Sequence, residues 1–209
     1  MIYLISKELF TKRKKNLIFA SDLDDESTKT TKMNTKHFPK DSMTENRTNV
    51  TDSTQKVSIV LFDEKRHRDA YKDLNVQWIS DLFTVEESDE KVLNHPEKIT
   101  ENGGYIFMAE YEGKPVGTCS LVKTADPKYD FEVAKFAVDN TIRGKGIGKM
   151  LMDACIEKAH EKDGKRIFLE TNHLLKAAIH LYERFGFIRI PLKHAGHERT
   201  DILMEKTIA

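Results

Sequence analysis

The residues of this sequence best suited to chemistry form a short glycine-rich stretch, 143–149, which reads RGKGIGK. Glycine reaches positive φ angles and carries no Cβ, so the backbone N–H groups around it can turn toward one bound anion. The glycines are Gly144, Gly146 and Gly148, and the basic residues among them are Arg143, Lys145 and Lys149. Apolar residues from Ile147 onward repeat at helical spacing, so the glycines lead into a helix N-terminus, which suits a phosphate. The stretch therefore predicts a diphosphate-binding loop.

Two better-known phosphate loops do not fit the same residues. A P-loop needs a glycine five positions before the glycine of a Gly-Lys pair and a hydroxyl residue after the lysine, but Arg143 and Met150 stand at those places. The dinucleotide pattern Gly-x-Gly-x-x-Gly also fails, because Lys149 or Leu151 falls where its third glycine should be. The loop therefore belongs to another class of phosphate site.

A strand must lead into this loop, because residues 129–138 are rich in strand-forming aromatic and β-branched residues. Two earlier strands, at 105–111 and 116–122, are joined by a short glycine-containing loop and form a hairpin. The helix after the loop runs to about Asp163, and Gly164 ends it. The loop is therefore expected at the end of a three-stranded antiparallel unit.

The other elements follow from apolar periodicity and turn residues. They are strands at 57–62, 165–171, 187–190 and 201–206, and helices at 64–82, 88–93 and 174–185. Ser88 is expected to cap the second of these helices, and Trp78 in the first is interpreted as a core side chain. The order β-α-α-β-β-β-α-β-α-β-β predicts an α/β (α+β) fold: a mixed, mostly antiparallel central sheet flanked by helices.

Residues 1–55 differ from residues 56–209, the predicted folded domain. From 21 to 55 the chain is polar, with almost no aliphatic periodicity, which predicts a disordered N-terminal extension. The 34 basic and 34 acidic residues cancel, so no basic field indicates a nucleic-acid or anionic-membrane partner. No apolar run approaches the about 18 residues of a membrane span, and no secretory signal is present, so a cytoplasmic location is expected. Cys119 and Cys155 are expected to be small buried side chains.

Two motifs together resemble the GNAT superfamily of acyl-CoA-dependent N-acyltransferases, over about residues 56–207. Arg143, Gly146 and Gly148 fill the pattern Arg-x-x-Gly-x-Gly, and residues 178–187 fill A-x-x-L-Y-x-x-x-G-F. The resemblance implies that the loop holds the pyrophosphate of acetyl-CoA, and that the strand before it pairs its backbone with the pantetheine arm. The residues expected to bind this co-substrate are Ala137, Val138, Arg143, Gly144, Lys145, Gly146, Ile147, Gly148, Lys149 and Asn172.

The resemblance also implies two catalytic residues. Tyr182, within the second motif, is expected to act as the general acid that protonates the leaving sulfur. Glu132 lies eleven positions before Arg143, where several family members carry a glutamate that deprotonates the amine. A carboxylate between Phe131 and Val133 in a strand needs a partner or a function, although an exposed sheet-edge or substrate-orienting glutamate would explain it equally.

Further residues are expected near the acceptor. Asn172 directly follows the strand at 165–171 and is expected to hydrogen-bond the pantetheine arm, although the family's usual asparagine position is occupied here by Leu175. Glu170 is expected to face the acceptor amine, and Arg199 to bind a substrate carboxylate. His197 is interpreted as a solvated loop histidine, with a role as base or substrate contact as the alternative. The eight histidines lack ligand spacing, so no metal site is expected.

The resulting functional prediction is an N-acetyltransferase that moves an acetyl group directly from acetyl-CoA to a primary amine of a small molecule or amino acid. The alternatives are a protein or peptide N-acetyltransferase and a non-catalytic acyl-CoA-binding sensor module. The family often dimerises, so a homodimer is an open expectation.

Overall fold

The computed structural model describes residues 56–142, 144–192 and 195–208, so the predicted N-terminal extension and Arg143 lie outside the described residues. The strands of the described chain are β1 (Val57–Leu61), β2 (Tyr105–Tyr111), β3 (Lys114–Lys123), β4 (Phe131–Val138), β5 (Arg166–Thr171), β6 (Ile188–Ile190) and β7 (Ile202–Thr207). Its helices are α2 (Glu64–Leu82), α3 (Glu87–Leu93), α4 (Glu97–Glu101), α5 (Ile147–Glu161) and α6 (Lys176–Arg184). None of these helices is long and apolar enough to span a membrane.

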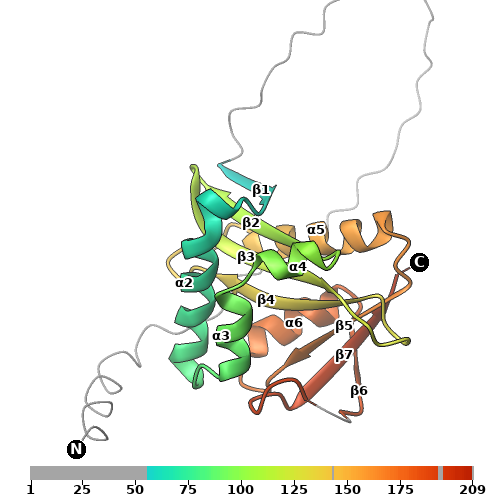
Figure 1. The fold of residues 1–209 in the computed structure, drawn as a ribbon. Coiled ribbons are helices and arrows are strands. Elements are labelled where there is room, and N and C mark those ends of the chain that lie inside the picture. The colour runs from blue at the N-terminus through green and yellow to red at the C-terminus, as the bar shows by residue number, and fades with distance from the viewer. Residues whose placement is uncertain (1–55, 143, 193–194, 209) are drawn as a thin grey trace, which may run out of the picture.

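The strands form one sheet in the order β1-β2-β3-β4-β5-β7-β6 (Figure 1). Every neighbouring pair is antiparallel except β4 and β5, which run parallel. The predicted fold class and element order are therefore confirmed, with one addition. The short helix α4 was missed because its five residues, of which only Ile99 is buried, are too few to show a helical repeat.

Successive side chains of each strand point to opposite faces of the sheet, so the core has two layers. In β2, Phe107 and Ala109 pack with α5 and α6, whereas Ile106 and Met108 pack with α2 and α3 on the opposite face. Helices α2, α3 and α4 accordingly cover one face of the sheet, and α5 and α6 cover the other (Figure 1).

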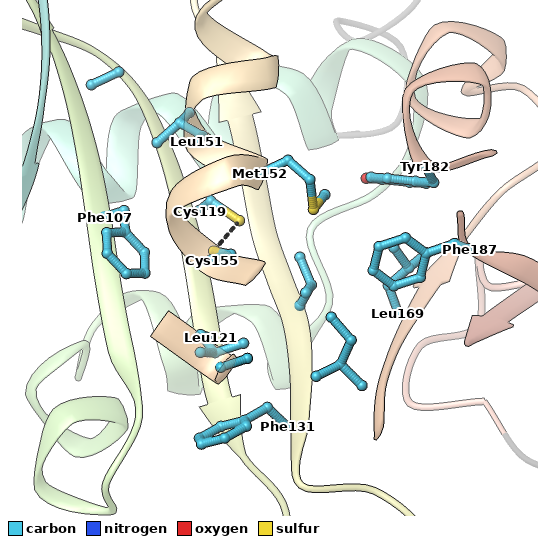
Figure 2. Packing of buried hydrophobic residues seen from close by; sticks show 14 of the residues in the cluster. Phe107, Cys119, Leu121, Phe131, Leu151, Met152, Cys155, Leu169, Tyr182 and Phe187 are labelled. Carbon is cyan, nitrogen blue, oxygen red and sulfur yellow. Dashed lines mark hydrogen bonds between the residues drawn. The ribbon is translucent and has the colours of Figure 1, made fainter. Parts of the chain in front are cut away.

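The two cysteines meet in the core beneath α5. Cys119 from β3 and Cys155 from α5 are fully buried, with their sulfur atoms 3.2 Å apart (Figure 2). Burial raises the pKa of the Cys119 thiol. Their predicted burial is confirmed.

Two irregularities of β4 open the sheet at its centre. Strand β4 pairs with β5 only through Phe131↔Ile167 and Glu132↔Phe168, so the two strands separate beyond that point. On its other side β4 carries an extra residue between the pairs Thr118↔Ala137 and Ser120↔Ala134, which is a β-bulge. Lys135 within this bulge has φ of 50°, an unusual backbone conformation for a residue with a side chain. The bulge and the separation together expose the middle of β4 to the space between the strands.

Candidate active site

The glycine loop has the backbone conformation that its sequence predicts. Gly144 and Gly146 have φ of 67° and 65°, and Gly146 is the N-cap of α5, which begins at Ile147. A Cβ added to either glycine would meet no atom within 4 Å, so the backbone is open to a ligand at both positions. Open N–H groups at a helix N-terminus, with Lys145 and Lys149 beside them, fit a diphosphate.

A cavity of about 220 Å³ begins at this loop and runs along β4 to α6. We call it the cofactor cavity. Its lining includes the described loop residues, the middle of β4, the end of β5 and the inner side of α6. Of the predicted co-substrate residues it contains Val138, Gly144, Lys145, Gly146, Ile147, Gly148 and Lys149. Ala137 is buried and does not line it, and Asn172 lies elsewhere.

A second cavity of about 70 Å³ adjoins the first and is called the acceptor cavity here. It contains Glu132, Asn172, His197, Arg199 and Thr200, together with the rings of Trp78 and Phe83. The residues that border both cavities are Trp78, Val133, Ala134, Lys135, Glu170, Thr171 and Leu175. The junction therefore lies where β4 and β5 separate. Trp78, interpreted from the sequence as core, packs partly in the α2 layer and also lines both cavities.

Glu132 enters the acceptor cavity from β4 because it alternates with Phe131 and Val133, which face the α5 side of the sheet. Within the described chain no group hydrogen-bonds its carboxylate. Burial, and after it the negative charge of Glu170, raise its pKa to about 7 against the opposing effect of Lys135. A carboxylate with this pKa can take up and release a proton near neutral pH.

Glu170 borders both cavities from the neighbouring strand. Its two carboxylate oxygens accept hydrogen bonds from the backbone N–H of Gly196, at 3.0 and 2.9 Å, and one also accepts from Thr200 Oγ1 at 3.0 Å. The loop before β7 therefore fixes this carboxylate beside Glu132. The two predicted acidic residues, Glu132 and Glu170, are brought together.

Tyr182 lines the cofactor cavity from α6. Its ring lies 6.1 Å from the rings of both Phe136 and Phe187, and its hydroxyl end points toward Met152 of α5 (Figure 2). No hydrogen-bond partner for the hydroxyl occurs among the residues that the structure describes. Burial raises the pKa of Tyr182, so the phenol keeps its proton and can donate it.

A buried ion-pair network that the sequence did not indicate forms one wall of the acceptor cavity. Asp89 of α3 is fully buried and accepts from Arg199 Nη1 at 2.7 Å, Arg199 Nη2 at 2.8 Å and Lys135 Nζ at 2.9 Å. Burial raises the pKa of Asp89, but the hydrogen bonds from Arg199 and Lys135 outweigh it and hold the pKa well below its ordinary value. The network joins α3, the β4 bulge and the segment before β7.

Two expectations need revision because of this network. Arg199 Nη1 also donates to Glu86 at 2.9 Å, so the guanidinium expected to bind a substrate carboxylate binds carboxylates of its own chain. Ser88 does not cap α3; Glu86 is the N-cap, and its N–H donates to Asp89 at 3.2 Å. Ser88 Oγ instead lies 3.0 Å from Nδ1 of His197.

His197 lines the acceptor cavity, so its interpretation as a solvated loop residue is wrong. Its side chain is 22% exposed and lies 3.4 Å from Glu86 and 3.8 Å from Asp89. Burial lowers its pKa, and the charges of Lys135 and Arg199 lower it further, which favours a neutral imidazole. Glu86, Asp89 and His197 lie close enough to share a cation, but Lys135 and Arg199 already bind the Asp89 oxygens.

Asn172 supports the backbone of the acceptor cavity. Its Nδ2 donates to the Arg199 carbonyl at 2.6 Å, and its Oδ1 accepts from the Leu174 N–H at 2.9 Å. Lys135 was also missed by sequence reasoning, although a lysine amid the apolar residues of β4 was a signal that it has a buried partner. Thr171, at the end of β5, also borders both cavities, and nothing in the sequence around it indicated that position.

The chain matches a sequence model of the Acetyltransferase (GNAT) family over residues 69–187. It is 36% identical over 108 residues to an uncharacterized N-acetyltransferase of Escherichia coli, YjgM, a match that covers 50% of this chain and 65% of that protein. It is 41% identical over 91 residues to N-alpha-acetyltransferase 30 of Saccharomyces cerevisiae, covering 41% of this chain and 52% of the relative. The chain therefore spans less than two thirds of these relatives.

Solved structures have the same fold. A GNAT-family acetyltransferase of Staphylococcus aureus superposes with a TM-score of 0.65 at 20% identity, covering 73% of this chain and 99% of that one. YncA of Salmonella typhimurium, solved with its cofactor acetyl-CoA, superposes with a TM-score of 0.61 at 17% identity, covering 74% and 95%.

We expect Gly146→Asp to weaken acetyl-CoA binding about tenfold or more relative to Gly146→Asn. Asparagine tolerates the left-handed conformation at this position, so the two variants differ chiefly by a negative charge at the α5 N-terminus. Isothermal titration calorimetry measures both affinities. Equal affinities would contradict the assignment of the diphosphate to this loop.

Asp89→Asn is expected to lower the free energy of unfolding by about 3–5 kcal/mol at pH 7, because Lys135 and Arg199, both largely buried, lose the carboxylate that they share. Glu90→Ala, at an exposed site of the same helix, is the control and should change it by less than about 0.5 kcal/mol. The pKa of Asp89 is lowered in the folded protein, so its ionised carboxylate stabilises the fold. This contribution is complete above the ordinary carboxyl pKa of 3.8 and is lost as pH falls below that value toward the folded pKa.

Urea denaturation at pH 7 and pH 3 measures the loss of stability in Asp89→Asn and its dependence on pH. The difference in the free energy of unfolding between wild type and Asp89→Asn should be about 1 kcal/mol smaller at pH 3 than at pH 7. A difference that is the same at both pH values would show that Asp89 does not carry a charge-dependent stabilisation.

Proposed function

This chain belongs to the Acetyltransferase (GNAT) family, and we propose on that premise that it transfers the acetyl group of acetyl-CoA directly to a primary amine. One observation carries the proposal: a carboxyl group with a pKa of about 7 and a protonated phenol border two joined cavities, one of which begins at a phosphate-type loop. Aminolysis of a thioester needs a base for the amine, a proton for the leaving sulfur and a fixed orientation of both substrates.

The co-substrate fits the cofactor cavity for reasons of shape and charge. The open backbone at Gly144 and Gly146, the α5 N-terminus and the two loop lysines suit a diphosphate at one end. The exposed edge of β4 offers unpaired backbone groups along the cavity, because β5 diverges from it. When bound there, acetyl-CoA supplies an activated acyl group at the junction of the two cavities.

Glu132 is the group that we assign as general base. In its ionised form it takes a proton from the ammonium of the acceptor, which leaves a neutral amine at the junction. Its pKa of about 7 places this proton transfer near neutral pH, and it has no cation among the described residues that would hold it ionised through a direct ion pair. Glu170 supports the assignment because its charge raises the pKa of Glu132.

Tyr182 is the group that we assign as general acid. Its buried hydroxyl stays protonated, and within the described structure it is committed to no other partner. It lines the cofactor cavity on the α6 side, opposite the acidic pair, so base and acid reach the junction from different faces of the sheet. This arrangement lets the amine lose a proton on one side and the sulfur gain one on the other.

The size of the acceptor cavity, about 70 Å³, supports a small-molecule amine as the acceptor. Acetylation of a protein N-terminus is the second candidate. It is favoured by the 41% identity, over 91 residues, to a yeast protein named as an N-alpha-acetyltransferase.

The function is tested by free-thiol release from acetyl-CoA with a panel of amines, amino acids and short peptides. Release that depends on an acceptor is expected for wild type. Tyr182→Phe should lower kcat on the order of tenfold to a hundredfold while acetyl-CoA affinity stays unchanged. Tight binding of acetyl-CoA with no acceptor-dependent release would favour the binding-module alternative instead.

The pH dependence of kcat/KM tests the assignment of the base. With one acceptor, wild-type kcat/KM should rise through about pH 7, because Glu132 must lose its proton to act. Glu132→Gln should lower activity on the order of a hundredfold and abolish this rise. Glu170→Gln should shift the rise to lower pH, because it removes a charge that raises the Glu132 pKa. If Glu170→Gln abolished the rise and Glu132→Gln did not, the general base would be Glu170 rather than Glu132.

A further inference from the structure

We infer that the acceptor is a primary amine carried on a small apolar group, with no carboxylate beside the amine. This inference rests on the proposed function and narrows its substrate class. It follows from the way in which the charges around the acceptor cavity are paired.

Lys135 and Arg199, the Lys and Arg residues that line this cavity in the described part of the chain, are already paired with carboxylates. Arg199 binds Asp89 through both Nη atoms, at 2.7 and 2.8 Å, and Glu86 through Nη1 at 2.9 Å. Lys135 binds Asp89 at 2.9 Å, with only 8% of its side chain exposed. A carboxylate on the acceptor would compete with Asp89 and Glu86 for these cations and would lose its hydration on entry.

The anions outnumber the cations among the described residues at this cavity. Asp89 and Glu86 balance Arg199 and Lys135, which leaves Glu170 without a cation: its hydrogen bonds come from a backbone N–H and a hydroxyl. Glu132 adds a second acidic group across the junction. The remaining field is therefore negative, which attracts an ammonium group and repels a carboxylate bonded next to it.

Part of the wall is apolar, beside the uncharged polar side chains of Thr171, Asn172 and Thr200. Trp78 and Phe83 present two rings whose centroids are 6.4 Å apart at 83°, and Leu175 and Val133 lie at the junction with the cofactor cavity. Aromatic and aliphatic surfaces of this kind bind hydrocarbon groups without directional requirements. An alkyl or aryl group behind the ammonium therefore fits the cavity better than a second charged group does.

Matched acceptors test the inference in the thiol-release assay. The pairs are 3-methylbutylamine with leucine and 2-phenylethylamine with phenylalanine, since each pair differs only by the α-carboxylate. Leucinamide and phenylalaninamide add an uncharged group of similar size at the same carbon. We expect kcat/KM to be at least tenfold higher for each amine than for its amino acid, with each amide closer to the amine.

A variant of the network tests the cause. Glu86→Gln removes one anion while Asp89 still holds Arg199, so the cavity becomes less negative with its shape conserved. The ratio of kcat/KM between amine and amino acid should fall several-fold in this variant. Ser58→Ala, an exposed change in β1 remote from the site, is the control and should leave the ratio unchanged.

Two outcomes overturn the inference: amino acids that react as well as their amines, or amides that are rejected as strongly as amino acids, which would make size rather than charge the criterion. If Glu86→Gln left the amine-to-amino-acid ratio of kcat/KM unchanged, the ion-pair network would not be the cause of the preference. Failure of the proposed function looks different, because then none of the acceptors, the peptides included, would release thiol from acetyl-CoA that the protein binds.

Discussion

The acceptor side of this molecule depends on one buried charge, the carboxylate of Asp89. An isolated ionised carboxylate in a protein interior is strongly unfavourable, and here the guanidinium of Arg199 and the ammonium of Lys135 compensate it directly. The three partners come from α3, the β4 bulge and the segment before β7, which lie far apart along the chain. Satisfying this charge therefore fixes three elements relative to one another, and the wall of the acceptor cavity is a consequence. The same pairing binds both cations to a carboxylate of the chain itself.

The cofactor side depends on the backbone of β4. Strand pairing with β5 stops after two residue pairs, and a bulge at Lys135 changes the twist of β4 at the same level. A regular sheet would have closed this space with hydrogen bonds between strands. The separation instead leaves a passage from the glycine loop to the acceptor cavity, bordered on opposite faces of the sheet by the acidic pair and by Tyr182. The reaction proposed for the junction depends on this interruption of the sheet.

The environment gives similar side chains different protonation behaviour within this small region. Burial and the charge of Glu170 raise the pKa of Glu132 to about 7, whereas hydrogen bonds from two cations overcome burial and lower that of Asp89. One carboxylate is therefore suited to exchange protons and the other to remain a fixed charge. His197, beside the same cations, is shifted toward the neutral form. The difference between the proposed general base and the structural aspartate follows from the partners of each group rather than from its residue type.

The sequence by itself determined the features that local chemistry encodes. Alternating apolar residues specified the strands, helical repeats specified the long helices, and the glycines at 144 and 146 specified the left-handed backbone that leads into α5, because each depends on residues that are close along the chain. Only the tertiary structure decided the partners of Asp89, Arg199, Lys135 and His197, and the place of Trp78 at the cavities. These depend on contacts between residues as many as 113 positions apart, for which short-range patterns carry no signal. An arginine available to a substrate and one bound to a buried aspartate are identical in sequence, and they differ only in what the fold places beside them.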